Sequence, residues 1–200
     1  LGELEYVNKY GFKLAIGVEP PSKKSLKTFR RKYLSAVTKL VRSKSIFTDK
    51  MPINFRYLKL LSLAIPEAKF IHVTRDPRAV CWSNFRHFFA SDGMRYTSDL
   101  SDIISYYRDY RDLCTVWERE HDINLFNLDY ESLVTDHPGE IAKLLADVGL
   151  KFESSCLTPE KSNRLVSTAS QRQVIKPIYS DSSEQWRNYS SHLNRHFARL

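Results

Sequence analysis

The 200-residue sequence has few glycines, few cysteines and no long apolar run. Its six glycines form neither a GxGxxG nor a GxxxxGK pattern, which excludes a phosphate loop of either kind within the sequence. Its three cysteines are widely spaced, without a CxxC pair or a histidine cluster, so no zinc site or disulfide framework is indicated. We therefore expect a protein of a reducing compartment, the cytoplasm, that holds no metal.

The sequence also lacks any stretch of about eighteen apolar residues, so we expect no membrane-spanning segment. It opens on Leu1-Gly2-Glu3-Leu4, without a methionine or a leader pattern, and we interpret it as beginning inside a longer reading frame. A length of 200 residues suits one domain with a real core, and we expect a single domain over residues 1–200.

The net charge of +8 lies entirely in the first quarter of the chain, because residues 1–50 carry 12 basic and 4 acidic side chains and the rest carry 19 of each. The spacing of apolar residues predicts one amphipathic helix over residues 23–44. Its basic face is open to three interpretations: a solvated surface, attraction of an anionic substrate, or direct contact with phosphate. The apolar positions of this helix are Leu26, Phe29, Tyr33, Val37, Leu40 and Val41.

An alternation of strands and helices follows. Residues 45–48 are short and β-prone, and Pro52 suits the first turn of a helix that ends at Pro66. Residues 70–74 read as a buried strand, and a helix follows to about Phe89. Strands joined by a helix are parallel with a right-handed crossover, which predicts the open α/β class.

The pattern continues beyond residue 90. We expect a helix over residues 100–120, a strand over 124–130, a helix over 138–148 that ends at Gly149, and a helical tail around Trp186. The helix over 100–120 carries several tyrosines among aspartates and arginines, which indicates an exposed or acceptor-side face.

Two basic residues fall where the first two predicted strands end. Lys50 follows the first strand and Arg75 follows the second, directly before Asp76, which can cap the next helix. In an open parallel sheet, ligands bind at the carboxyl ends of the strands, where helix N-termini favour anions. The spacing therefore indicates a phosphate or sulfate site with Ser83 a turn or two inside the helix, although such cations can also be solvated boundary residues.

Residues 47–55 and 70–80, together with Ser83, resemble the sulfotransferases that use 3′-phosphoadenosine 5′-phosphosulfate (PAPS). The nearest branches are the bacterial sulfotransferases with tetratricopeptide repeats and the tyrosylprotein sulfotransferases. The resemblance implies an α/β fold of three layers, a parallel sheet flanked by helices, related to that of P-loop nucleotide-binding enzymes. It also implies that Arg75 and Ser83 hold the 3′-phosphate of the donor.

Further segments resemble the same family in the same order along the chain. Residues 130–133 are similar to its YED-L segment, which implies that Tyr130 lies near the adenosine of the donor, and residues 173–177 are similar to a segment of the tyrosylprotein branch. The Gly2-Glu3 pair implies that Glu3 is the base that takes the acceptor's proton. Lys50 is similar to the lysine that stabilises charge on the leaving oxygen, a role that needs no metal.

The sequence departs from the family in two places. The 5′-phosphosulfate loop would precede residue 1, so the resemblance implies an N-terminally truncated domain. Between Pro177 and Trp186, relatives have a basic residue on the 3′-phosphate, and this chain has none. We expect Lys176 or Arg187 to compensate and Ser170 to approach the donor.

The resemblance implies transfer of a sulfuryl group from PAPS to a hydroxyl acceptor, which is a protein tyrosine, a saccharide or a small alcohol. It implies no nucleic-acid partner and leaves the oligomeric state open. The alternative is a non-catalytic module that binds nucleic acid or another polyanion through the basic helix 23–44. A P-loop kinase would require a Walker loop and a magnesium ligand, and the sequence shows neither.

Overall fold

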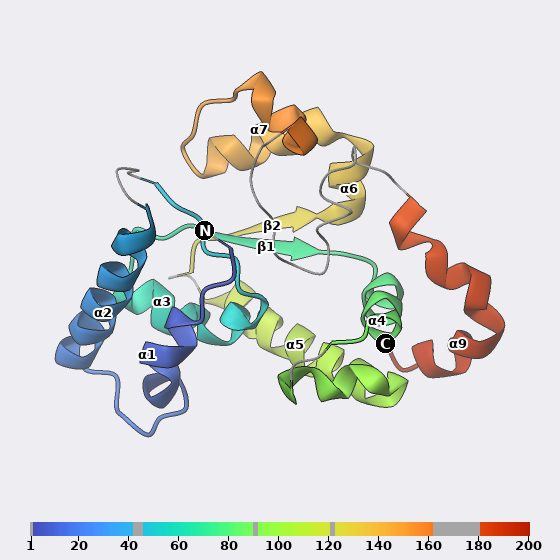
Figure 1. Cartoon of the computed structure of the whole chain (residues 1–200), viewed down its shortest axis with the longest axis horizontal. Helices are drawn as coiled ribbons and strands as arrows, with labels where there is room; N and C mark the ends of the chain where they lie inside the picture. Colours follow the sequence, from blue (N-terminus) through green and yellow to red (C-terminus); the bar gives the residue numbers. More distant parts are fainter. Residues whose placement is uncertain (1, 42–45, 90–91, 121–122, 162–180) are drawn as a thin grey trace. The chain divides into compact units, whose positions relative to one another are not determined.

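The computed structural model describes residues 2–41, 46–89, 92–120, 123–161 and 181–200. The chain divides into two compact units, which we describe separately. Unit 1 consists of residues Leu1–Phe70 and Cys114–Leu125, and unit 2 of Ile71–Leu113 and Phe126–Leu200. Figure 1 shows the elements in sequence colours.

Unit 1 is helical. It contains α1 (Tyr6–Ala15), α2 (Lys23–Val41), a 3-10 turn (Pro52–Tyr57) and α3 (Leu58–Ala64). Helix α1 approaches its neighbours so closely at Gly11 that a Cβ atom there would lie 2.6 Å from Leu60 Cδ2 and 2.9 Å from Phe29 Cε2. The buried core of the unit is formed by Val7, Leu14, Phe29, Tyr33, Val37, Val41, Tyr57, Leu60, Leu61, Ala64 and Ile65.

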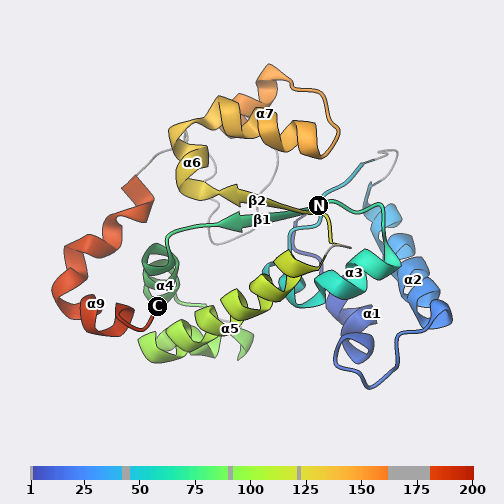
Figure 2. The same ribbon diagram turned by 180° about the vertical axis from the view of Figure 1, so that it is seen from behind.

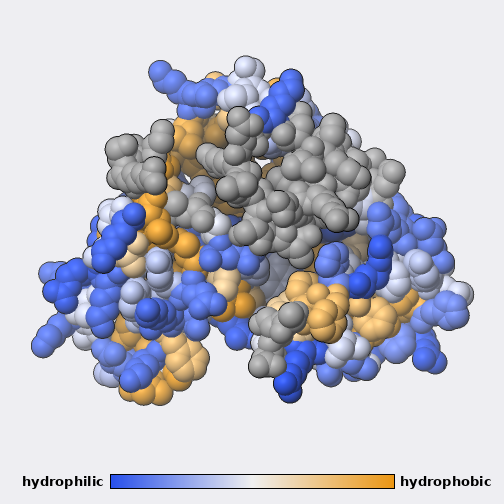
Figure 3. Space-filling view, viewed as in Figure 1, coloured by the Kyte–Doolittle hydropathy of each residue, from blue (hydrophilic) through white to orange (hydrophobic). Residues whose placement is uncertain are grey.

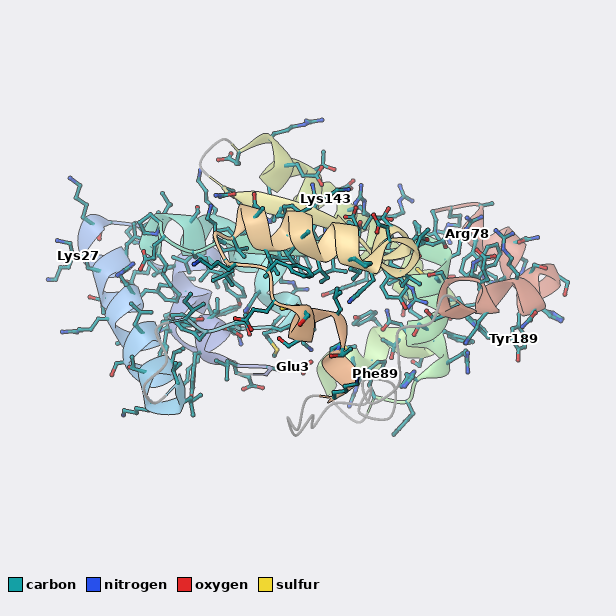
Figure 4. All side chains as sticks on the ribbon, turned by 90° about the horizontal axis from the view of Figure 1, so that it is seen from above. Glu3, Lys27, Arg78, Phe89, Lys143 and Tyr189 are labelled. Atoms are coloured by element: carbon teal, nitrogen blue, oxygen red, sulfur yellow. The ribbon has the colours of Figure 1, made fainter. Side chains whose placement is uncertain are left out.

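The predicted amphipathic helix is confirmed as α2 from Lys23 to Val41, and residues 42–44 lie outside the described residues. Its apolar stripe packs into the core, except that Leu40, which we expected on this stripe, is 45% exposed. The reason is its place near the end of the helix, beside Val41, which fills the core position. The surface over α2 is largely hydrophilic in Figure 3, and Lys27 lies on its outer side in Figure 4.

The strand that we predicted over residues 45–48 is wrong for its described part, because residues 46–50 form no strand. A β-prone segment becomes a strand only where a neighbouring strand supplies hydrogen-bonding partners. Here the main-chain N–H of Lys50 instead donates to the carbonyl oxygen of Gly2 at 3.2 Å. Lys50 therefore does not follow a strand, unlike Arg75.

The predicted parallel sheet is confirmed and, among the described residues, consists of two paired strands, β1 (Phe70–Thr74) and β2 (Leu125–Asp129). In Figures 1 and 2, α6 (Tyr130–Thr135) and α7 (His137–Asp147) lie on one side of the strands. Helix α4 (Pro77–Arg86) and the unit 2 part of α5 (Leu100–Arg119) lie on the other side. The α/β class and the layered arrangement that we predicted therefore hold.

The ends of the unit 2 elements differ slightly from the predictions. Helix α4 ends at Arg86, three residues before the expected Phe89, while α7 is followed by Gly149 with a φ of 74°, as predicted. The tail forms a 3-10 turn (Gln185–Tyr189) and α9 (Ser190–Phe197). Its core residues pack with those of α4 and α5, and the buried members are Ala79, Cys81, Ile103, Ile104, Trp186, Leu193 and Phe197.

No helix among the described residues combines the length and the apolar character needed to cross a bilayer.

Candidate active site

The carboxyl end of β1 places Arg75 directly before α4. Asp76 caps this helix, as predicted, because its Oδ1 accepts hydrogen bonds from the main-chain N–H groups of Arg78 (2.8 Å) and Ala79 (3.0 Å). Burial raises the pKa of the Asp76 carboxyl, but hydrogen bonds from Arg78 and Ala79 outweigh it, so the pKa lies below its usual value. Proline at position 77 fits the first turn, where no N–H is required. The cap fixes the direction in which the chain leaves the strand.

Groups from two other segments of unit 2 contact Arg75. Its Nε donates to Ser183 Oγ at 3.2 Å, and its Nη2 donates to the carbonyl oxygen of Ser182 at 2.5 Å. The guanidinium lies over the Tyr130 ring, with Cζ 4.9 Å from the ring centroid. The Tyr130 hydroxyl and Ser182 Oγ share a hydrogen bond of 2.8 Å. The strand, the start of α6 and the turn before the tail thus converge on one cation.

Glu131 completes this group. Its Oε1 accepts a hydrogen bond of 2.5 Å from the hydroxyl of Ser183, and a weak one of 3.4 Å from the main-chain N–H of Asp76. Ser183 is only 6% exposed. Because its hydrogen is directed to Glu131, its oxygen accepts from Arg75, and the carboxylate orients the guanidinium through the hydroxyl. We call Arg75, Tyr130, Glu131, Ser182 and Ser183 the Arg75 cluster.

Of the other donor-binding candidates, the two described residues make no hydrogen bond with this cluster, and the rest lie outside the described residues. Ser83 is half-buried in α4, and its side chain makes no hydrogen bond with any described residue. Arg187 is exposed, forms an ion pair with Glu184 and lies 5.0 Å over the Trp186 ring. Ser170 and Lys176, with the whole of residues 173–177, lie outside the described residues.

In unit 1 the structure brings Glu3 and Lys50 together as an ion pair. The pair is exposed, with 39% of the Glu3 side chain and 64% of the Lys50 side chain accessible. Glu3 lies in the segment before α1 (Figure 4), which the hydrogen bond from Lys50 N–H to Gly2 holds beside Lys50. Gly2 has a φ of 93°, a backbone conformation that favours glycine. We call Glu3 and Lys50 the Lys50–Glu3 pair.

Asp49 anchors the segment that carries this pair. Its Oδ2 accepts a hydrogen bond of 2.9 Å from the Tyr33 hydroxyl in α2, and the carboxyl also interacts with the main-chain N–H of Leu4 and with Asn54. Burial raises the pKa of Asp49, and these hydrogen bonds only partly offset it. Burial and the nearby Asp49 charge likewise raise the pKa of Tyr33. Asp49, which precedes Lys50, thus holds Leu4, which follows Glu3, close to Lys50.

The two groups offer different chemistry. A guanidinium held at two of its N–H donors still presents three others, which suits an anion such as phosphate. An exposed amine and carboxylate can stabilise developing negative charge and accept a proton. In the parts of the chain that the structure covers, no group of histidine, cysteine, aspartate or glutamate side chains is arranged to hold a metal ion.

A family model described as the sulfotransferase family matches residues 12–154, well over half of the chain. The chain belongs to the sulfotransferase family. The matched range includes Lys50, Arg75, Ser83 and Tyr130, and Glu3 precedes it.

The chain is also similar to a curated protein in sequence and to solved domains in structure. A protein of Aquifex aeolicus (strain VF5), named only as uncharacterized, is 33% identical over 192 residues, or 95% of this chain. The chain spans a quarter of the length of that relative. Two solved sulfotransferase domains share the fold: one from the Synechococcus PCC 7002 olefin synthase (TM-score 0.62, 19% identity) and one from the curacin biosynthetic pathway (TM-score 0.51, 13% identity). Each alignment covers 92% of this chain, and 72% and 71% of the respective domains.

The sequence alone did not indicate several members of the two groups. Glu131 was part of a segment already singled out, but nothing in its spacing indicated a hydrogen bond to Ser183, which is 52 residues away. Ser182 and Ser183 attracted notice only because their segment lacks a basic residue. Asp49, beside Lys50 in the matched segment, was not assigned a role.

Proposed function

We propose that this sulfotransferase moves a sulfuryl group from PAPS to an acceptor hydroxyl. The observation that carries the proposal is the Arg75 cluster, in which a cation at the carboxyl end of a parallel strand is oriented by neighbouring side chains. Membership of the family supports the reaction class. The acceptor class, among tyrosine, saccharide and small alcohol, stays open within the proposal.

The residues of the Arg75 cluster fit the donor's 3′-phosphate and adenosine. The unused N–H donors of Arg75 would bind the phosphate oxygens, and the Tyr130 ring and hydroxyl offer an apolar surface and a polar end to the nucleoside. Ser83, Ser170, Lys176 and Arg187 remain proposed contacts of the donor on the strength of the resemblance. When bound, PAPS supplies an activated sulfuryl group.

The Lys50–Glu3 pair would act on the reacting atoms. The carboxylate of Glu3 accepts the hydrogen of the acceptor hydroxyl while a bond forms between the acceptor oxygen and sulfur. The bond between sulfur and the bridging oxygen of the donor breaks, and its electron pair stays on that oxygen as part of adenosine 3′,5′-bisphosphate. The ammonium of Lys50 stabilises the charge that develops there. No metal ion is required for this step.

The test is transfer of radiolabelled sulfate from PAPS to a panel of phenols, sugars and alkyl alcohols. We expect at least one acceptor class to be labelled, and Glu3→Gln to lower its turnover about 100-fold, as expected for loss of a general base. Glu5→Gln, a change of another exposed glutamate nearby, is the matched control and should keep wild-type turnover. Absence of transfer to every class, together with absence of adenosine 3′,5′-bisphosphate binding, would contradict the proposal.

The exposed basic face of α2 supports a second candidate, a polyanion-binding module. Six of its basic side chains are exposed: Lys23, Lys24, Lys27, Arg31, Lys32 and Lys39. This function predicts binding of DNA or heparin that weakens steeply with salt and is lost when Lys23, Lys24 and Lys27 are changed to alanine. Nucleotide binding that survives these changes, without any polyanion binding, would exclude it.

A further inference from the structure

A cavity of about 420 Å³ opens in unit 2 at the carboxyl end of β1. Its wall includes Thr74 and Arg75 from the strand end and Tyr107, Arg108, Arg111 and Asp112 from α5. The strand end and the helix face are therefore brought together around one hollow. We call it the arginine cavity.

The lining is rich in arginine. Three arginines and one acidic side chain, that of Asp112, line the cavity together with Leu200 at the end of the sequence. Arg108 and Arg111 are one turn apart on α5 and so share a face of the helix. Arg108 is exposed and makes no hydrogen bond or ion pair with any other described residue. Arg75 uses two of its five N–H donors within the Arg75 cluster. The side chains that line the cavity thus carry a net positive charge.

We propose that the arginine cavity binds a phosphate monoester dianion, with Arg108 and Arg111 as further ligands beside Arg75. The identity of the ester rests on the proposed function, in which it is the 3′-phosphate of the donor nucleotide. A guanidinium group pairs with phosphate oxygens through two parallel hydrogen bonds. Several guanidinium groups together favour a ligand with two negative charges, such as a phosphate monoester, over a carboxylate ligand with one. The hydroxyls of Thr74 and Tyr107 add donors, and the volume leaves room for the organic part of the ester.

The test measures the affinity of two nucleotides by calorimetry: adenosine 3′,5′-bisphosphate and adenosine 5′-monophosphate. In the variant R108Q/R111Q we expect the affinity for the bisphosphate to fall about 10- to 100-fold, because charge-assisted hydrogen bonds are lost. The affinity for the monophosphate should stay within about twofold, since it lacks the 3′-phosphate. The matched control is Arg119→Gln, which removes the same charge from an exposed position of α5 outside the cavity lining.

The single variant Arg108→Gln keeps the test valid if the double variant does not fold, because Arg108 is exposed and its replacement should not disturb the core. By itself it should weaken bisphosphate binding about fivefold. If R108Q/R111Q and Arg119→Gln bind the bisphosphate alike while Arg75→Ala loses it, the inference is overturned and the proposed function stands. If the wild-type protein does not prefer the bisphosphate to the monophosphate, both the inference and the proposed donor are wrong. Equal loss for both nucleotides would also overturn the inference.

Discussion

The Arg75 cluster and the Lys50–Glu3 pair differ in how firmly the fold holds them. Arg75 is half-buried and receives contacts from the start of α6 and from the turn before the tail, one of them through a 6% exposed serine. Lys50 and Glu3 are exposed and contact each other beside a segment anchored by Asp49. A preformed, oriented cation suits binding, whereas an exposed pair can separate when each member meets its own reacting atom.

The difference predicts how each group responds to mutation. An exposed ion pair contributes only ~0–1 kcal/mol to stability, so a large loss of activity on removing one member reflects chemistry. A buried hydroxyl that loses its partner costs about 1–3 kcal/mol, so changes in the Arg75 cluster should affect both binding and stability. Measuring turnover, nucleotide affinity and unfolding in parallel therefore separates the two groups.

The largest effect is expected for Lys50→Ala. Turnover should fall about 100- to 1,000-fold, as when one electrostatic donor at a developing charge is removed. The affinity for adenosine 3′,5′-bisphosphate should change less than about threefold, because this role concerns the transition state. Single-turnover transfer and calorimetry measure the two quantities. Lys27→Ala, another exposed lysine of unit 1, is the control, and equal losses of turnover and affinity in Lys50→Ala would indicate a binding role only.

A smaller effect, of the opposite kind, is expected for Arg75→Ala. Affinity for adenosine 3′,5′-bisphosphate should fall about 10- to 150-fold, since a charge-assisted hydrogen bond contributes about 1.5–3 kcal/mol. Turnover at saturating donor should change much less. Arg95→Ala, an arginine of unit 2 outside both the Arg75 cluster and the arginine cavity, is the comparison. An unchanged affinity in Arg75→Ala would refute the donor-binding role of the cluster.

The third effect concerns Glu131 as a positioning residue. Glu131→Gln removes the charge that orients Ser183, and we expect bisphosphate affinity to fall roughly fivefold. Ser183→Ala should have a similar effect, and the double variant should lose little more, because both residues act through one hydrogen-bonded chain. A double-mutant cycle on affinity measures this coupling. Additive losses would show that Glu131 does not act through Ser183.

The features that could be predicted from the sequence are those that depend on local signals. The Asp76 cap, the helix after Pro77 and the left-handed Gly149 depend on neighbours within a few residues, and all three were predicted. The prediction of a strand before Lys50 was wrong, because strand pairing depends on distant residues that the segment itself does not specify. The contact between Arg75 and Ser183 joins residues 108 apart in the sequence, so no local spacing indicates it.

The candidate site divides in the same way. Arg75 could be predicted from its position at a strand end, which is a rule of open parallel sheets. The roles of Glu3 and Lys50 were expected only through the resemblance to the family, and their ion pair, which joins residues 47 apart, was not predicted. From the sequence, the arginines of the helix over residues 100–120 were assigned only to an exposed or acceptor-side face, and the place of Arg108 and Arg111 at the end of β1 follows from the fold.

The smallest effect is expected for Asp49→Asn, which tests how the Lys50–Glu3 pair is held. Burial raises the pKa of Asp49 despite hydrogen bonds from Tyr33 and others. The folded protein therefore binds more protons at this site than the unfolded chain, and its contribution to the free energy of unfolding falls as the pH rises through the acidic range up to the raised pKa. The variant lacks this ionisation, so its stability relative to wild type should increase with pH over that range.

The Asp49→Asn variant keeps a hydrogen-bond acceptor at this position, because the oxygen of the introduced amide can still accept from the N–H of Leu4. Turnover should therefore stay within about twofold of wild type. Asp49→Ala removes the acceptor, and turnover should fall more than in Asp49→Asn because the segment that carries Glu3 loses its anchor. Denaturant unfolding at a series of pH values measures the first expectation, and the transfer assay measures the second. Parallel stability curves for wild type and Asp49→Asn would show that Asp49 does not titrate in this way. Equal turnover in Asp49→Asn and Asp49→Ala would show that Asp49 does not position the pair.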